Sequence, residues 1–170
     1  MKLLKTALLL LLLCLVFHTC EKDDICVDGD TPQLVIGFYD FEDREVLKEV
    51  PTLIIRGDDG SDTELETISF VANDSNTVSL PLRPTMAATV FILSQNPTPN
   101  DTTTVNTDTI SLTYETTDKF VSRACGFVAN YDNVEASFTT EADDGNWIKD
   151  IEVIVPLIEN SNETHVKIYH

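Results

Sequence analysis

Positive charge is scarce in this sequence, which contains 11 Lys and Arg residues against 29 Asp and Glu residues. Proteins that bind nucleic acid rely on Lys and Arg side chains that meet phosphates. A net charge of −18 therefore argues against a nucleic-acid partner. The same excess of acid argues against adsorption to an anionic lipid surface by charge alone, although it helps to keep a protein soluble.

Metal ligands and catalytic motifs are also few. The chain has four Cys and three His residues. It has no Cys-x-x-Cys motif, and beyond the N-terminal segment only His165 and His170 could supply imidazole ligands, so a zinc site is poorly supported. Ser122, Arg123 and Cys125 lie close together, but no His lies near them and no Gly-x-Ser-x-Gly motif occurs. We predict no metal site, no cofactor and no catalytic residue.

Helical periodicity is missing as well, since no segment keeps a 3.6-residue repeat over three turns. Short runs of alternating apolar and polar residues are instead separated by Gly, Asn, Asp and Pro, which is typical of β-strands. The expected strands are 34–40, 52–56, 67–72, 77–82, 88–94, 109–114, 119–129, 148–156 and 165–169. This pattern predicts one all-β domain, an antiparallel β-sandwich of about 8–9 strands with an Ig-like or jelly-roll-like arrangement. A barrel stays open as an alternative, because a count of strands does not distinguish it.

The alternation predicts which side chains enter the core. The inward-facing positions of the first and sixth expected strands are Leu34, Ile36, Phe38, Ile110, Leu112 and Tyr114. Residues 88–94 are apolar on both faces, which indicates a central strand. Residues 95–106 are rich in Pro, Asn and Thr and indicate a long exposed loop.

The only long apolar run lies at residues 7–17, behind Lys2 and Lys5. Eleven residues are too few to span a bilayer, which takes about 20, but they suit the apolar part of a signal helix. No Ala-x-Ala site follows, and Cys20 stands at the end of the run, which resembles the lipobox of bacterial lipoproteins. We expect a lipoprotein signal peptide at 1–19, a lipid-modified (palmitate-bearing) Cys20 with a tether at 20–32, and the β-sandwich at 33–170.

Three charged residues after Cys20 indicate where in the cell envelope the protein is located. Lys22, Asp23 and Asp24 are similar to the signal that sends lipoproteins of the Bacteroidota to the outside of the outer membrane. We therefore expect an outer-membrane protein that faces the cell exterior and contacts the membrane through its lipid anchor. An ordinary solvated tether, with the domain in the periplasm, is the alternative. Loss of residues 1–19 would leave nine basic and 29 acidic residues, a net charge of −20.

Two cysteines remain in the mature chain once Cys20 carries lipid, namely Cys26 and Cys125. An even number of cysteines in an exported chain indicates a disulfide, because the compartment is oxidising. We predict a Cys26–Cys125 bond, which would close a loop of about 100 residues. Two free thiols are the alternative.

The acidic turns and the aromatic residues could each have either a structural role or a ligand-binding role. The turns at 57–62 and 143–146 suit hairpin geometry better than calcium, because they lack the ligand spacing of an EF-hand loop. The aromatic residues Tyr39, Tyr114, Tyr131 and Trp147 suit a core better than a sugar-binding surface, with Trp147, beside a turn, as the expected exception.

Two threonines match a modification motif. Thr102 and Thr109 each follow an Asp, and the pattern is similar to the O-glycosylation motif of the Bacteroidota. Thr102 lies in the expected loop, whereas Thr109 begins an expected strand. Thr102 is therefore the better acceptor.

Four segments together carry a family resemblance: CEKDDIC at 20–26, FYDF at 38–41, SRACGF at 122–127 and THVKIY at 164–169. They resemble an uncharacterised outer-membrane lipoprotein family of flavobacteria, known only by a domain-of-unknown-function label, over nearly all of the mature chain. The resemblance implies no activity. We expect a non-enzymatic envelope lipoprotein that is structural or binds a protein or glycan. The alternative is a surface carbohydrate-active enzyme or another hydrolase.

Overall fold

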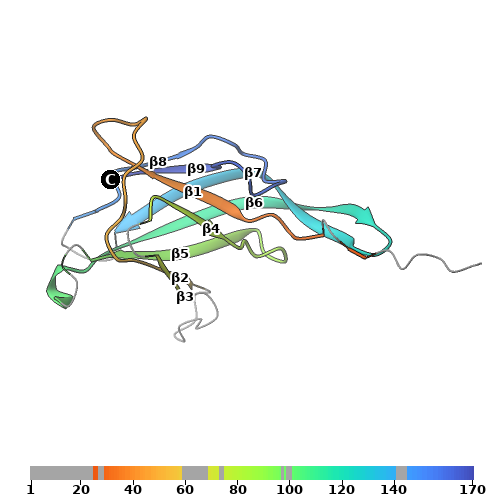
Figure 1. Cartoon of the computed structure of the whole chain (residues 1–170), viewed down its shortest axis with the longest axis horizontal. Coiled ribbons are helices and arrows are strands. Elements are labelled where there is room, and N and C mark those ends of the chain that lie inside the picture. Colours follow the sequence, from red (N-terminus) through yellow and green to blue (C-terminus); the bar gives the residue numbers. More distant parts are fainter. Residues whose placement is uncertain are drawn as a thin grey trace, which may run out of the picture.

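The computed structural model describes residues 25–26, 29–58, 69–72, 75–96, 98, 101–140 and 145–170, which form two packed β-sheets (Figure 1). The elements are β1 Leu34–Tyr39, β2 Leu53–Asp58, β3 Ser69–Ala72, β4 Thr77–Leu80, β5 Ala88–Gln95, the 3-10 turn η2 Thr102–Thr104, β6 Asn106–Ser122, β7 Gly126–Thr140, β8 Asp150–Val153 and β9 Val166–Tyr169. The predicted all-β sandwich is confirmed. The expected signal peptide at 1–19 lies outside the described residues.

The two sheets have four and five strands. The strand orders are β4-β1-β9-β8 and β3-β2-β5-β6-β7. Within the described strands every pair is antiparallel except β1 and β9, which run parallel. A parallel pair needs a long crossover connection, and here nearly the whole domain lies between the two strands. The predicted antiparallel arrangement is therefore wrong for this one pair.

The core lies between the sheets and follows the predicted alternation. Leu34, Ile36 and Phe38 of β1 are fully buried, as are Ile110 and Leu112 of β6, and Tyr114 is nearly so. Each fully buried Leu or Ile side chain contributes about 1.5–3 kcal/mol relative to an exposed one. The expected central strand, β5, is paired on both sides, with β2 and β6.

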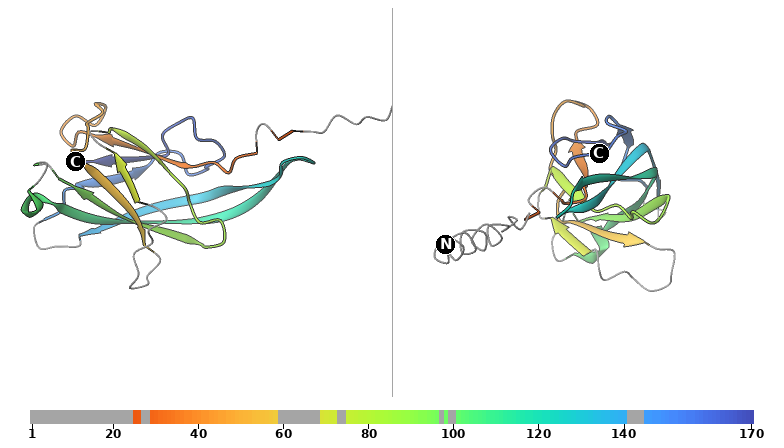
Figure 2. Two further views of the ribbon diagram at one scale, coloured as in Figure 1. Left: turned by 60° about the horizontal axis from the view of Figure 1, so that its bottom comes forward. Right: turned by 90° about the vertical axis from the view of Figure 1, so that its right-hand side faces the viewer.

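The hairpin of β6 and β7 extends beyond the rest of its sheet. β5 pairs with β6 only as far as Thr113, whereas β6 continues to Ser122. Residues 115–132 therefore form a two-stranded projection, here called the arm, which reaches past the other strands in Figures 1 and 2. The N-terminal chain arrives at this end, and the C-terminus lies at the other.

A β-bulge at the base of the arm explains why the sequence did not predict β7 beyond residue 129. Asn133 has a φ of 52°, and the ladder shifts register between Thr113 and Glu115. Two residues of β7 then lie opposite one residue of β6, which breaks the two-residue period. As a result Tyr131 and Val134 are both buried although they are three positions apart.

The segment after β8 closes the adjoining edge of the sandwich. Ile158 and Tyr131 exchange backbone hydrogen bonds of 2.8 and 3.1 Å, and Val134 N donates to Pro156 O. These bonds tie the connection between β8 and β9 to β7 at the bulge. The base of the arm is thus held by both sheets.

Candidate functional site

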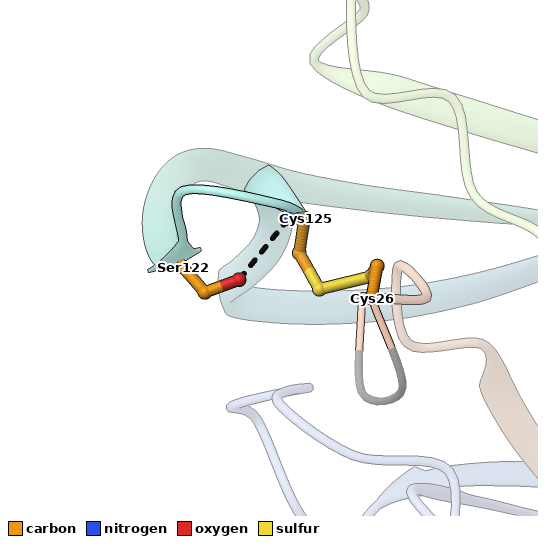
Figure 3. Close-up of a disulfide and its surroundings, with 3 residues drawn as sticks. All are labelled: Cys26, Ser122 and Cys125. Atoms are coloured by element: carbon orange, nitrogen blue, oxygen red, sulfur yellow. Dashed lines mark hydrogen bonds between the residues drawn. A yellow bond between two sulfur atoms is a disulfide. The ribbon is translucent and has the colours of Figure 1, made fainter. Parts of the chain in front are cut away.

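The disulfide at the tip of the arm is the most strongly defined chemical feature of the described chain. Cys26 and Cys125 are bonded, with their Cα atoms 4.8 Å apart, which confirms the predicted pair (Figure 3). The Oγ of Ser122 accepts a hydrogen bond of 3.1 Å from the backbone N of Cys125. Both candidate nucleophiles therefore have structural partners.

Cys125 lies in a turn and not in a strand. The sequence predicted a continuous strand over 119–129, but β6 ends at Ser122 and β7 begins at Gly126. Gly126, the first residue of β7, has a φ of 73°, a left-handed conformation that glycine adopts readily where the chain turns. Gly126 was the signal for this turn. Arg123 and Cys125 both lie in this turn, so they do not share one face of a strand.

Gly29 lies against the disulfide. A Cβ at this position would overlap Cys26 Sγ and lie 2.9 Å from Cys125 Cβ. Glycine is therefore the residue that allows the N-terminal chain to pass this close to the bond. Sequence reasoning did not find this residue, because nothing in the local pattern shows what it packs against.

A pocket of about 490 Å³ lies at the opposite end of the sandwich. It is here called the end pocket, and its polar lining includes Lys48, Glu49, Gln95, Asn106, Lys149 and His170. These residues come from the ends of strands and the loops beside them. Figure 1 shows the C-terminus at this end, far from the arm.

The basic groups of the end pocket already have partners. Lys48 Nζ lies 3.0 Å from Asp40 Oδ2 and donates to the backbone O of His170 at 2.7 Å. The hydrogen bond from Lys48 is the main cause that lowers the pKa of Asp40. Burial lowers the pKa of His170, so its ring is neutral at pH 7. Lys149 Nζ donates to Asn146 O.

Trp147 belongs to the core, which corrects the prediction that it is exposed. The residue is only 4% exposed, and its indole Nε1 donates to Leu93 O at 3.2 Å. Its ring centroid lies 6.3 Å from that of Phe38. The ring therefore presents little surface on which a sugar could stack.

The three tyrosines that the sequence assigned mainly to the core differ in burial. Tyr114 and Tyr131 are buried and meet edge to face, with ring centroids 5.0 Å apart. Burial raises the pKa of Tyr131 to about 12. Tyr39 is only half-buried, and Lys167 Nζ lies 4.6 Å from its ring centroid.

The two histidines considered as zinc ligands have different surroundings. His165 is fully buried, and its Nδ1 accepts a hydrogen bond of 2.9 Å from Val35 N. His170 lines the end pocket. Among the described residues no group of three His, Cys, Asp or Glu side chains is placed to hold a metal ion. Residues 59–62 and 143–144 of the two acidic turns lie outside the described part.

The two threonines of the glycosylation motif lie in different settings. Thr102 is exposed in η2, where Asp101 caps the turn by accepting from Thr103 N at 3.0 Å. Thr109 is half-buried in β6, between Ile92 and Thr139 on the neighbouring strands. The acceptor role of both stays a prediction, with Thr102 the more accessible.

Cys20, the predicted lipid-bearing residue, lies outside the described residues. The predicted surface-export residues Lys22, Asp23 and Asp24 also lie outside them. Within the described part, no helix has the length and apolar character needed to cross a bilayer.

Comparison with known proteins gave one family match. A model described as "Family of unknown function (DUF6452)" matches residues 52–170. No curated protein and no solved structure matches the chain. The match includes Cys125 but begins after Cys26 and β1, so it is shorter than the resemblance predicted. Because it covers more than half of the sequence, the chain belongs to the Family of unknown function (DUF6452).

Proposed function

We propose that this protein is a lipid-anchored lipoprotein of the outer membrane in Bacteroidota, exported with a signal helix at 1–19 and displayed toward the exterior. Its role is that of a non-enzymatic structural or binding module. The observation that carries the proposal is the Cys26–Cys125 disulfide. Disulfides persist in oxidising compartments outside the cytosol, which agrees with export by the apolar N-terminal segment.

The position of the disulfide supports an anchored role. It fixes a point six residues after Cys20 to one end of the long axis, at the tip of the arm. The end pocket lies at the other end. A partner from the surrounding medium would therefore meet the end pocket first, since the anchored end faces the membrane.

Replacement of the lipid-accepting cysteine tests the anchor. Cys20→Ala should move the protein from the membrane fraction to the soluble or uncleaved precursor fraction, and the N-terminal peptide should lose its acyl mass. Cys14→Ala is the matched control, because Cys14 lies inside the apolar run and should leave lipidation unchanged. Unchanged acylation in the Cys20 variant would refute the proposal.

Surface display has its own test. Replacing Lys22, Asp23 and Asp24 together with Ala should protect the domain from protease added to intact cells, while acylation stays normal. Asp30→Ala is the control within the same tether. Equal cleavage of both variants would contradict the export signal and would mean that these residues are an ordinary solvated tether.

The hydrolase alternative finds less support in the end pocket. Glycoside hydrolysis uses two carboxyl groups about 5–10 Å apart. Among the described lining residues Glu49 is the only carboxylate, and Trp147 is turned into the core. Release of reducing sugar from surface polysaccharides, lost in Glu49→Gln, would establish the enzyme and overturn the binding role.

A further inference from the structure

The three most exposed large hydrophobic side chains of the described chain lie at the same end of the molecule. Ile25 is 81% exposed, Phe127 67% and Phe120 57%. Phe120 and Phe127 are cross-strand neighbours near the end of the arm, with ring centroids 5.4 Å apart. Together these three residues are here called the tip patch.

The disulfide holds Ile25 at the same end of the arm as the two rings. Ile25 directly precedes Cys26, whose Cα lies 4.8 Å from that of Cys125. Consecutive Cα atoms are about 3.8 Å apart, so the Cα atoms of Ile25 and Cys125 are no more than about 9 Å apart. Phe127 follows Cys125 by two residues. The tip patch therefore joins two segments about 100 residues apart in the sequence.

The predicted anchor keeps the tip patch close to a bilayer. Cys26 follows Cys20 by six positions in the sequence, and a fully extended chain covers at most about 3.6 Å per residue. The tip of the arm thus stays within about 20 Å of the lipid-bearing residue, whatever path the tether takes. The arm projects toward this side, so its end meets the membrane before the sandwich does.

Charge at the tip differs from charge in the rest of the chain. Residues 119–131 contain Lys119 and Arg123 and no Asp or Glu. Both side chains are exposed. Long basic side chains can reach phosphate groups while neighbouring apolar groups enter the boundary of the acyl chains. Glu159 Oε2 lies 3.9 Å from Lys119 Nζ, and Asp23 and Asp24 directly precede Ile25 in the sequence. The end of the arm is thus mixed in charge, whereas the chain as a whole has a net charge of −18.

We propose that the tip patch inserts into the outer layer of the bilayer that carries the anchor, so that the domain has a second, non-covalent membrane contact. This inference rests on the lipid anchor of the proposed function. Three side chains on a narrow arm bury far less than the roughly 1,200 Å² typical of a specific protein interface. A second copy or a protein partner is therefore a poorer occupant. A bilayer has no such requirement, because the anchor already holds the arm close to it.

Tryptophan fluorescence tests the contact on the full lipidated protein. The chain has a single Trp, which is 4% exposed in the core beside the end pocket. In phosphatidylcholine vesicles whose acyl chains carry bromine, a quencher of Trp, the added emission of Phe127→Trp should fall at least about two-fold, since interfacial groups lie about 5–10 Å deep. Leu47→Trp is the matched control, because Leu47 is 46% exposed in the loop after β1 and should not be quenched.

The outcomes separate the two proposals. Flotation with the vesicles and selective quenching of Trp at position 127 supports the contact, and adding Phe120→Ser should then reduce the quenching. Flotation with equal emission of the position 127 and position 47 variants overturns the contact and leaves the anchor intact. A blue-shifted but unquenched emission at position 127 overturns it in favour of a protein occupant. Failure to float, with Cys20 unmodified, overturns both.

Discussion

Replacing Cys26 and Cys125 with Ser removes the covalent link between the tether and the arm, and its effect on stability follows from two loops. In the unfolded chain the bond closes a loop across a sequence separation of 99 residues. In the folded protein the chain is fixed from Gln33 onward, where the backbone N donates to Ser161 Oγ at 2.8 Å. The bond therefore restrains only about seven further residues in the folded state.

The difference in length between these two loops determines how much free energy of unfolding is lost. The entropic cost of loop closure grows as (3/2)RT ln n, so the ratio of about 99 to 7 gives a loss of about 2 kcal/mol in the free energy of unfolding. A bond that closed the same loop between two rigid points would contribute about 5 kcal/mol. We therefore expect the lower value, with a fall in Tm of about 5–8 °C for a domain of this size.

Urea unfolding followed by Trp147 fluorescence measures this loss, because Trp147 is buried beside the end pocket and not at the disulfide, so it reports on the whole domain. Ser122→Ala is a suitable control, since it removes only the hydrogen bond to Cys125 N. A loss near 5 kcal/mol would mean that residues 26–33 are rigid without the bond. No loss at all would contradict the loop argument altogether.

Three further predictions concern single residues. Burial lowers the pKa of His165, so the contribution of the neutral ring to stability is complete above the unfolded pKa of about 6.5 and is lost as the pH falls below it. Chemical denaturation at several pH values measures how the free energy of unfolding falls with pH. His165→Asn should reduce this dependence on pH and leave the part due to His170. Gly29→Ala should make the disulfide easier to reduce by at least about ten-fold in a dithiothreitol titration, because the new Cβ overlaps Cys26 Sγ, and reduction like that of wild type would refute the close approach. Asn133→Val should lower the free energy of unfolding by about 1–2 kcal/mol, because Val tolerates a φ of 52° poorly; Asn133→Gly should change it little, and equal losses would contradict the bulge.

Much of the fold could be predicted because one face of most strands is buried. Period-2 alternation then appears directly in the sequence, and it correctly placed Leu34, Ile36 and Phe38 in the core. The disulfide was also predictable, since only two cysteines were left to pair once Cys14 was assigned to the predicted signal peptide and Cys20 to the predicted anchor. These features depend on local pattern or on a count, and both can be read without knowledge of distant contacts.

Other features depended on contacts that the sequence does not display. The bulge at Asn133 interrupted the alternation and concealed the second half of β7. Trp147 beside a turn suggested exposure, but Phe38 and Leu93 from distant strands cover it. The parallel pairing of β1 with β9 likewise joins opposite ends of the domain.

The disulfide also decides where a mechanical load would enter the domain. A pull on the N-terminal tether passes from Cys26 directly to Cys125, so the chain between them is bypassed. This segment, with a sequence separation of 99 between its ends, would otherwise extend by about 330 Å when fully stretched. Force arriving at the tip of the arm would run along β6 and β7 and shear their ladder of hydrogen bonds together. The bond thus limits how far the domain can lengthen under tension, as long as it remains oxidised.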